Sequence, residues 1–136
     1  MDSSIIELDL SGRNLSDLPD LSIYPNLQTL YCSLNNLTSL DNLPIGLKKL
    51  YCGNNQIKSL DNLPISLQEL HCSCNKITSL DNLPINLQIL YCHYNEITSL
   101  DNLPSSLQEL DCSNNTLNYD FEPTLENIIK NIVNKN

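Results

Sequence analysis

The same pattern of apolar and polar residues recurs along this chain at a constant spacing, which is the distance in sequence from Leu27 to Leu47. The stretch 27–37 reads L-Q-T-L-Y-C-S-L-N-N-L, and matching stretches begin at Leu47, Leu67, Leu87 and Leu107. Inside each stretch, apolar and polar positions alternate with a period of two, which is typical of a short β-strand with one buried face. The pattern therefore predicts an array of equal units, each with one strand.

A unit of this length is too small to bury its own apolar positions. Leu40, Leu43 and Leu47 add three inward-facing anchors to the strand residues Leu30 and Cys32. Stacked units cover one another's apolar edges, with their strands paired in parallel about 4.8 Å apart. We therefore predict a solenoid in which six coils form a stack roughly 25 to 30 Å long.

The segments between the strands carry no helical periodicity. Each contains a proline, which fixes φ and removes a hydrogen-bond donor, so the outer side is predicted to be extended or turn-like. These prolines occupy positions 19, 44, 64, 84 and 104. One asparagine recurs after each regular strand and is predicted to satisfy main-chain groups where the strand turns away. The asparagines are Asn35, Asn55, Asn75, Asn95 and Asn115.

Both ends of the array depart from the pattern. The first unit, residues 5–26, is a variant repeat with Arg13 where later units have asparagine. Residues 27–121 form five regular repeats, of which the last is incomplete. Residues 122–136 are predicted to form an amphipathic helix with Pro123 in its first turn. We expect the helix to cap the open end of the stack, and a partner-binding helix is the alternative. Its apolar face comprises Leu125, Ile128, Ile129, Ile132 and Val133.

The unit L-x-x-L-x-C-x-x-N-x-[LI], usually completed by L-D-N-L-P, resembles the leucine-rich repeat family over residues 5 to about 120. The short period and the Leu-Pro pair resemble those of bacterial effector proteins, and the strand cysteine is similar to repeats of giant DNA viruses. The resemblance implies one domain, residues 1–136, with an α/β-type solenoid fold. This fold is a right-handed coil with parallel strands on the concave face and an extended or turn-like convex side. The resemblance also implies a non-enzymatic role in protein–protein interaction.

The outward-facing strand positions differ from unit to unit, which predicts a partner-binding site on the concave face. Tyrosine and histidine recur in the central row, and tyrosine favours interfaces because it offers contact area at low entropic cost. The candidate residues are Tyr31, Tyr51, His71, Tyr91, Asp111, Lys49, Glu69, Ile89, Glu109 and His93. The first units contribute Glu7, Asp9 and Thr29 to the same rows. The alternative is that cross-strand aromatic pairs only stabilise the sheet.

Five of the six cysteines follow the repeat and are predicted to face inward as free thiols. Parallel side chains in a ladder rarely reach the dihedral angle of about 90° that a disulfide requires. These cysteines are Cys32, Cys52, Cys72, Cys92 and Cys112. Cys74 lies in a loop and forms the other candidate constellation with His71 and His93. A metal site there lacks an evident fourth ligand, and a catalytic Cys–His pair oriented by Glu69 lacks a pocket. Both remain alternatives to protein binding, and no cofactor is expected.

The chain is strongly acidic. Its formal net charge is −9, with an isoelectric point near 4.3 and only 7 Lys and Arg residues. Binding to nucleic acid needs clustered basic residues, so the expected partner is instead a protein or peptide of basic character. No apolar run reaches the roughly 18 residues of a membrane span, so we expect a cytoplasmic location, in the host for a viral or effector protein.

Two further features leave alternatives open. Asp41, Asp61, Asp81 and Asp101 each precede an asparagine and are predicted to cap the turn that follows, with cation binding as the alternative. The first coil has no evident cover, so the chain is expected to be a monomer or a weak end-to-end dimer. A self-associating structural repeat is a third functional possibility.

Overall fold

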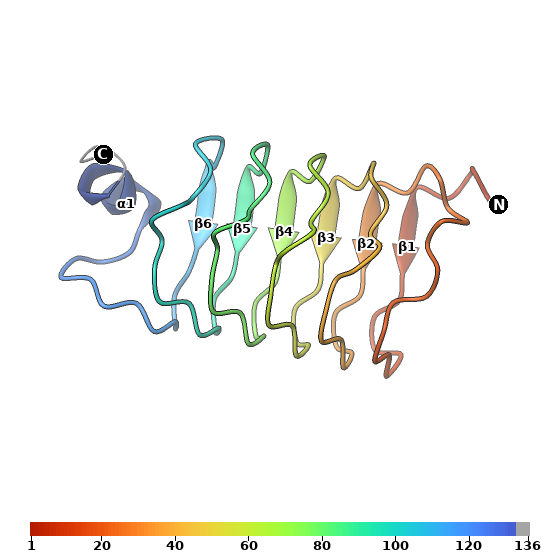
Figure 1. Cartoon of the computed structure of the whole chain (residues 1–136), viewed down its shortest axis with the longest axis horizontal. Coiled ribbons are helices and arrows are strands. Elements are labelled where there is room, and N and C mark those ends of the chain that lie inside the picture. Colours follow the sequence, from red (N-terminus) through yellow and green to blue (C-terminus); the bar gives the residue numbers. More distant parts are fainter. Residues whose placement is uncertain (133–136) are drawn as a thin grey trace.

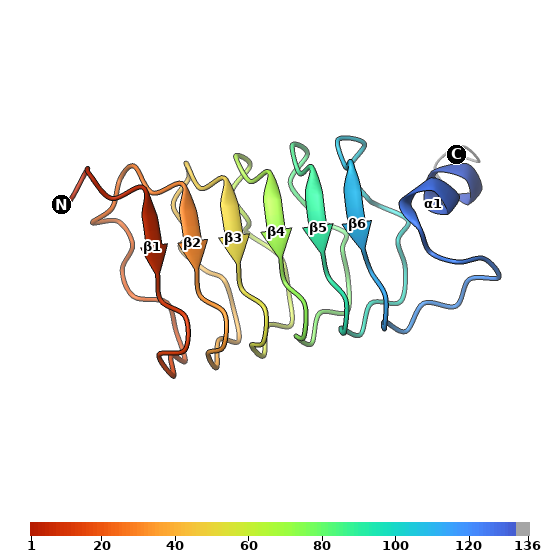
Figure 2. The same cartoon turned by 180° about the vertical axis from the view of Figure 1, so that it is seen from behind.

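The computed structural model describes residues 1–132. Its strands form one six-stranded parallel sheet in chain order, and Figures 1 and 2 show them side by side in a single row. The strands are β1 (Glu7–Asp9), β2 (Thr29–Tyr31), β3 (Lys49–Tyr51), β4 (Glu69–His71), β5 (Ile89–Tyr91) and β6 (Glu109–Asp111). The helix α1 (Leu125–Asn131) lies at the end of the stack beyond β6 (Figure 1). The predicted solenoid with a C-terminal helix is confirmed.

The register of the sheet follows the sequence repeat. Leu30 pairs with Leu50, and Leu50 pairs with Leu70. The spacing along the sequence between β1 and β2 is longer than the spacing between later strands, because Leu30 pairs with Leu8 in β1. Equivalent positions of successive coils therefore form continuous columns along the stack.

The core lies between the strands and the outer segments. The strand leucines Leu30, Leu50, Leu70 and Leu90 have no exposed surface, and the five repeat cysteines are at most 2% exposed. These cysteines are free thiols, as predicted. Burial raises the pKa of Cys32 to about 12. A small apolar side chain suits this position because the coil is thin. Of the three predicted outer anchors, Leu40 and Leu47 are buried and Leu43 is half-buried.

The repeated asparagines tie each coil to the one before it. The Nδ2 of Asn75 donates to the main-chain oxygens of Cys52 and Cys72, at 3.1 Å each. Its Oδ1 accepts the N–H of Ile57 at 2.9 Å. One side chain thus pairs main-chain groups that no strand partner reaches, as the sequence predicts.

Arg13 in the first coil makes different bonds from the asparagines of the later coils. The guanidinium of Arg13 instead donates to the main-chain oxygen of Asp9 at 2.9 Å. The N–H of Arg13 donates to Oδ1 of Asn35, the first regular member of the asparagine ladder.

The C-terminal helix begins later than predicted. Thr124 is its N-cap, since the Thr124 hydroxyl accepts the N–H of Asn127 at 3.2 Å. Pro123 therefore precedes the helix and does not lie in its first turn. Its main-chain oxygen accepts a hydrogen bond from the Cys112 thiol.

The cap itself depends on a narrower apolar face than predicted. Ile128 is fully buried in the core, and Leu125 and Ile132 pack against the core. Ile129 is 42% exposed, so it does not belong to the covered face. Val133 lies outside the described residues. Within residues 1–132, α1 is the only helix, and no helix there combines the length and apolar character needed to cross a membrane.

Candidate binding face

Four aromatic side chains form a continuous stack on the outward face of the sheet. We call this outward face of β1–β6 the strand face, and Tyr31, Tyr51, His71 and Tyr91 the aromatic column. Successive ring centroids lie 4.7, 4.5 and 4.5 Å apart, and each ring is half-buried. The angle between neighbouring rings increases along the column, from 17° at its start to 76° between His71 and Tyr91. The parallel register creates this stack, because it places the four residues directly opposite one another.

Glu69 is the polar centre of the strand face. Its Oε1 accepts the Tyr51 hydroxyl at 2.9 Å and lies 2.8 Å from Nε2 of His71. Its Oε2 lies 3.3 Å from the Lys49 ammonium, and the Glu69 side chain is only 16% exposed. Partial burial opposes ionisation, but the three partners prevail and hold the pKa of Glu69 below its ordinary value. Burial and the bond to Glu69 raise the pKa of Tyr51 to about 12.

A second polar group lies at the β6 end of the column. The Tyr91 hydroxyl donates to the Glu109 carboxylate, and this bond raises the pKa of Tyr91. Nδ1 of His93 lies 3.3 Å from Oδ2 of Asp111, but the two atoms do not form a hydrogen bond of good geometry. Ser113 donates both its N–H and its hydroxyl to Asp111. Despite partial burial, these bonds keep the pKa of Asp111 low.

The remaining predicted face residues lie in register beside the column. Lys49, Glu69, Ile89 and Glu109 form one flanking row, in which Ile89 is half-buried and Glu109 is exposed. Thr29 starts this row but is only 7% exposed. The expectation that Thr29 belongs to the accessible surface is therefore wrong. Its side chain is short and lies between the longer side chains of Glu7 and Lys49 in adjacent strands.

In the structure, the side chains of the two histidines in the Cys–His constellation are each paired with a different acid. His71 is engaged by Glu69, and His93 lies beside Asp111. Cys74 is half-exposed at a left-handed turn position with a φ of 56°, and its N–H donates to the main chain of His93. In the part of the chain that the structure describes, no three His, Cys, Asp or Glu residues are arranged to hold a metal ion.

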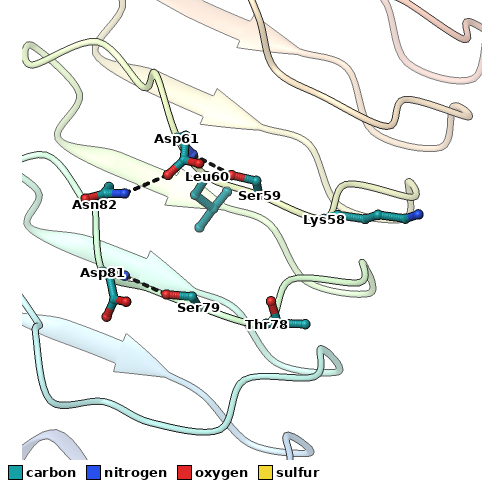
Figure 3. A pocket seen from close by; sticks show the side chains of 8 residues that line it. All are labelled: Lys58, Ser59, Leu60, Asp61, Thr78, Ser79, Asp81 and Asn82. Atoms are coloured by element: carbon teal, nitrogen blue, oxygen red, sulfur yellow. Dashed lines mark hydrogen bonds between the residues drawn. The ribbon is translucent and has the colours of Figure 1, made fainter.

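The outer aspartates bond differently from the prediction. Asp61 and Asp81 line a hollow of about 280 Å³ on the outer side. Figure 3 shows their side chains. The Asp61 carboxylate accepts the side-chain amide of Asn82, from the next coil, at 2.7 Å. The turn is instead capped by Ser59, whose hydroxyl accepts the N–H of Asp61 at 3.1 Å. The prediction that each aspartate caps its own turn is therefore wrong, because serine two residues earlier already fills that role.

Sequence reasoning missed a row of exposed isoleucines at the turn before each strand. Ile45, Ile65 and Ile85 are 90%, 65% and 68% exposed, respectively. All three follow the Leu-Pro pair, and Ser105 occupies the same position in the next unit. This break in an otherwise apolar column was the signal that the position is not part of the core. The three residues, which we call the isoleucine rim, lie outside the strand face.

Comparison with known proteins identifies the repeat. A family model for leucine-rich repeats in two copies matches residues 45–85 and 65–105, and a leucine-rich repeat model matches residues 106–128. The chain belongs to the leucine-rich repeat family. A search of curated proteins finds no match to this leucine-rich repeat chain.

Two solved leucine-rich repeat structures resemble the chain closely. The structure described as a Shigella effector LRR domain is 39% identical, with a TM-score of 0.78 over 85% of this chain. YopM from Yersinia enterocolitica WA-314 is 38% identical, with a TM-score of 0.71 over 82% of this chain. The matched region spans 52% of the Shigella domain and 27% of YopM. Both similarities support the expected likeness to effector-type leucine-rich repeat proteins.

Proposed function

We propose that this leucine-rich repeat chain is a non-enzymatic module that binds a protein or peptide on its strand face. The observation that carries the proposal is the aromatic column, with ring centroids 4.5 to 4.7 Å apart. Stacked, half-buried rings present a large surface that loses little conformational freedom on binding. The contact surface would comprise the column with Lys49, Glu69, Ile89, His93, Glu109 and Asp111.

The family context supports this function. Leucine-rich repeat domains generally bind proteins, and the two similar structures come from bacterial effector proteins. We propose that the chain acts in the cytoplasm, and in the host cell if it is an effector. Its net charge of −9 favours a partner of basic character.

The proposal predicts that partner binding and fold stability can be separated. In a Tyr51→Ala/Tyr91→Ala variant, we expect loss of the partners that the natural chain captures from native cells. The unfolding free energy should decrease by only about 1 to 3 kcal/mol, because three cross-strand aromatic contacts are lost. The matched control is Ile65→Ser/Ile85→Ser on the isoleucine rim, which should retain every partner. Quantitative mass spectrometry of the captured proteins compares the variants.

Two results bear against the proposal. A column variant that keeps its stability and every captured partner would remove the column as the binding site. If the double variant unfolds, Tyr31→Ala tests the same surface, since Tyr31 is the terminal ring of the column and its hydroxyl forms no side-chain hydrogen bond with residues 1–132. Unchanged capture by a folded Tyr31→Ala variant then counts against the column.

We further propose that the chain is predominantly monomeric. β1 is an edge strand, and an antiparallel pair of β1 strands centred on Leu8 would place Glu7 opposite Asp9 of the second copy. Like charges in directly opposed positions destabilise a strand pair. Sedimentation should show a monomer at low salt, and a stable dimer under that condition would contradict this proposal.

A further inference from the structure

The ionised carboxylates of the strand face differ in how fully they are already paired. In the middle, Glu69 bonds to Tyr51 and His71 and pairs with Lys49. A partner would have to displace these groups before it could use the Glu69 charge. The centre of the face therefore presents aromatic rings to an incoming ligand but no unpaired charge.

The two ends of the face keep negative charge that a partner can reach. At the β6 end, Glu109 is exposed and the Asp111 side chain is 46% exposed. Glu109 bonds to the Tyr91 hydroxyl and Asp111 to the Ser113 hydroxyl, and these uncharged groups leave both negative charges in place. At the β1 end, Glu7 and Asp9 are exposed. Arg13 lies close to Asp9 and offsets part of the charge there. The β6 end is consequently the more acidic of the two.

Each end also borders a hollow beside an edge strand. A hollow of about 320 Å³ at β1 is lined by Glu7, Leu8, Asp9 and Tyr31. A hollow of about 230 Å³ at β6 includes Asp111 and Glu122 together with Leu110 and Leu125. Both combine carboxylates with an apolar wall, which suits a long basic side chain whose stem packs while its charge reaches the acids.

The distance between the ends sets the length of a matching ligand. Asp9 and Asp111 lie at the same strand position five strands apart, which at about 4.8 Å per step gives about 24 Å. An extended peptide advances about 3.3 Å per residue, so about seven residues bridge this distance. The intervening residues would lie over the aromatic column.

We propose that the occupant of the strand face is an extended peptide segment with two basic side chains about seven residues apart. This inference rests on the proposed function and specifies its partner. Residues between the two basic side chains pack on the aromatic column, and the basic side chains enter the acidic hollows. Since charge complementarity defines both contacts, binding weakens as salt increases.

Two synthetic ten-residue peptides of identical composition test the proposal. Both contain two arginines and eight Leu, Pro, Tyr and Ser residues. One carries Arg at positions 2 and 9, and the other carries Arg at positions 5 and 6. Fluorescence anisotropy with labelled peptides measures their dissociation constants for the full chain at about 50 mM salt. We expect at least about threefold tighter binding of the widely spaced peptide, because only that peptide reaches both ends.

Conservative variants assign the effect to the two ends. Glu109→Gln/Asp111→Asn keeps the size of both side chains and one acceptor oxygen on each, and we expect it to remove most of the preference for wide spacing, since only Glu122 remains in that hollow. Glu7→Gln should reduce the preference less, because Arg13 already offsets charge at that end. The Ile65→Ser/Ile85→Ser control should retain the full preference.

The possible failures are distinguishable. Equal affinities for the two peptides, both lowered by Tyr51→Ala/Tyr91→Ala, would overturn the spacing inference and support the proposed binding face. Binding that is indifferent to the Tyr51→Ala/Tyr91→Ala change would count against both. Absence of binding to either peptide would overturn the proposal that the occupant is an extended basic segment, and the capture experiment would still test the face itself.

Discussion

The side-chain nitrogen of Asn55 lies 3.0 Å from the main-chain oxygen of Cys32, one coil earlier in the solenoid. The same nitrogen lies 3.0 Å from the main-chain oxygen of Cys52, in its own coil. Its Oδ1 accepts the N–H of Leu37 at 3.0 Å. A single amide therefore joins two coils through three buried main-chain groups, and this contact recurs along the stack.

Asn55→Ala should be strongly destabilising. The Cys32 and Cys52 oxygens keep donors from Asn35 and Asn75, but the buried N–H of Leu37 loses its partner. An unsatisfied buried donor and the space left by the amide together should reduce the unfolding free energy by about 3 kcal/mol.

The neighbouring Gln56 provides the control for this measurement. Its side chain is exposed, so Gln56→Ala should alter the unfolding free energy by less than about 0.5 kcal/mol. Urea titrations followed by circular dichroism give both values. Equal stability of the two variants would show that the asparagine ladder does not hold the coils together.

The cap helix provides a test of packing with two adjacent isoleucines. Ile128 is fully buried, whereas Ile129 is 42% exposed. Ile128→Ala should cost about 2 to 4 kcal/mol, because it removes core contacts and leaves a cavity. Ile129→Ala should cost less than about 1 kcal/mol. Thermal and urea unfolding compare them, and similar losses for both would contradict the observed orientation of the helix.

Glu69 should contribute to the loss of stability in acid. Its pKa is lower in the folded chain than its ordinary value of 4.5, so the unfolded chain takes up a proton first as the pH falls. The stabilisation is fully present above about pH 4.5 and decreases as the pH falls through the folded-state pKa. Glu69→Gln should therefore lose less stability than the natural chain between neutral pH and pH 3.

Glu96 serves as the matched acidic control, because its side chain is exposed and outside this network. Other carboxylates with low pKa values, including Asp111, remain in every variant and add the same acid dependence to each. Urea titrations at several pH values should therefore give Glu96→Gln the natural profile. Identical profiles for Glu69→Gln and Glu96→Gln would show that the bonds to Glu69 do not stabilise the fold.

Cys74 should be the thiol that reacts in the folded chain. It is half-exposed, while the five repeat cysteines are buried. Burial also raises the pKa of those five thiols, so the reactive thiolate is scarce at pH 8. Mass spectrometry after brief alkylation should show one modification in the native state and six after unfolding.

Cys74→Asn supplies the control for alkylation. Asn54 and Asn114 occupy the same left-handed turn position in other coils, with φ values of 55° and 54°. The substitution should therefore preserve the fold and eliminate native-state labelling. Labelling of a repeat cysteine in the folded variant would show that the coils open more readily than the buried cysteine column implies.

The fold could be predicted because its main features repeat in the sequence. The constant period places Leu30, Leu50 and Leu70 in one column, and stacking buries units that are too short to form a core alone. The asparagine ladder was predictable for the same reason. An amide that recurs beside each buried strand must form hydrogen bonds there, and unpaired main-chain groups are the partners available.

Features that depend on which particular side chains and main-chain groups meet could not be predicted in this way. Asp61 accepts a bond from Asn82, and this pairing has no signature in either unit alone. The burial of Thr29 depends on its longer neighbours in β1 and β3. The start of α1 at Leu125 follows from the capping bond of Thr124, which competes with the equally suitable signal of Pro123.

The candidate face was predicted as a set of residues but not as a network. Alternation placed Tyr51, Glu69 and His71 on one surface, and the register confirms that placement. Their mutual hydrogen bonds depend on side-chain conformations, which a pattern of residue types does not specify. It is this network that makes the middle of the face neutral and leaves the acidic ends available.

Site-specific photo-crosslinking tests the proposed role of the strand face most directly. A benzophenone amino acid replaces Tyr31 in one variant and Ile65, on the isoleucine rim, in the other, and both are irradiated in native cell extract. We expect a specific covalent adduct from position 31 that excess unlabelled natural chain suppresses, and none from position 65. A competed adduct that forms only from position 65 would contradict this expectation.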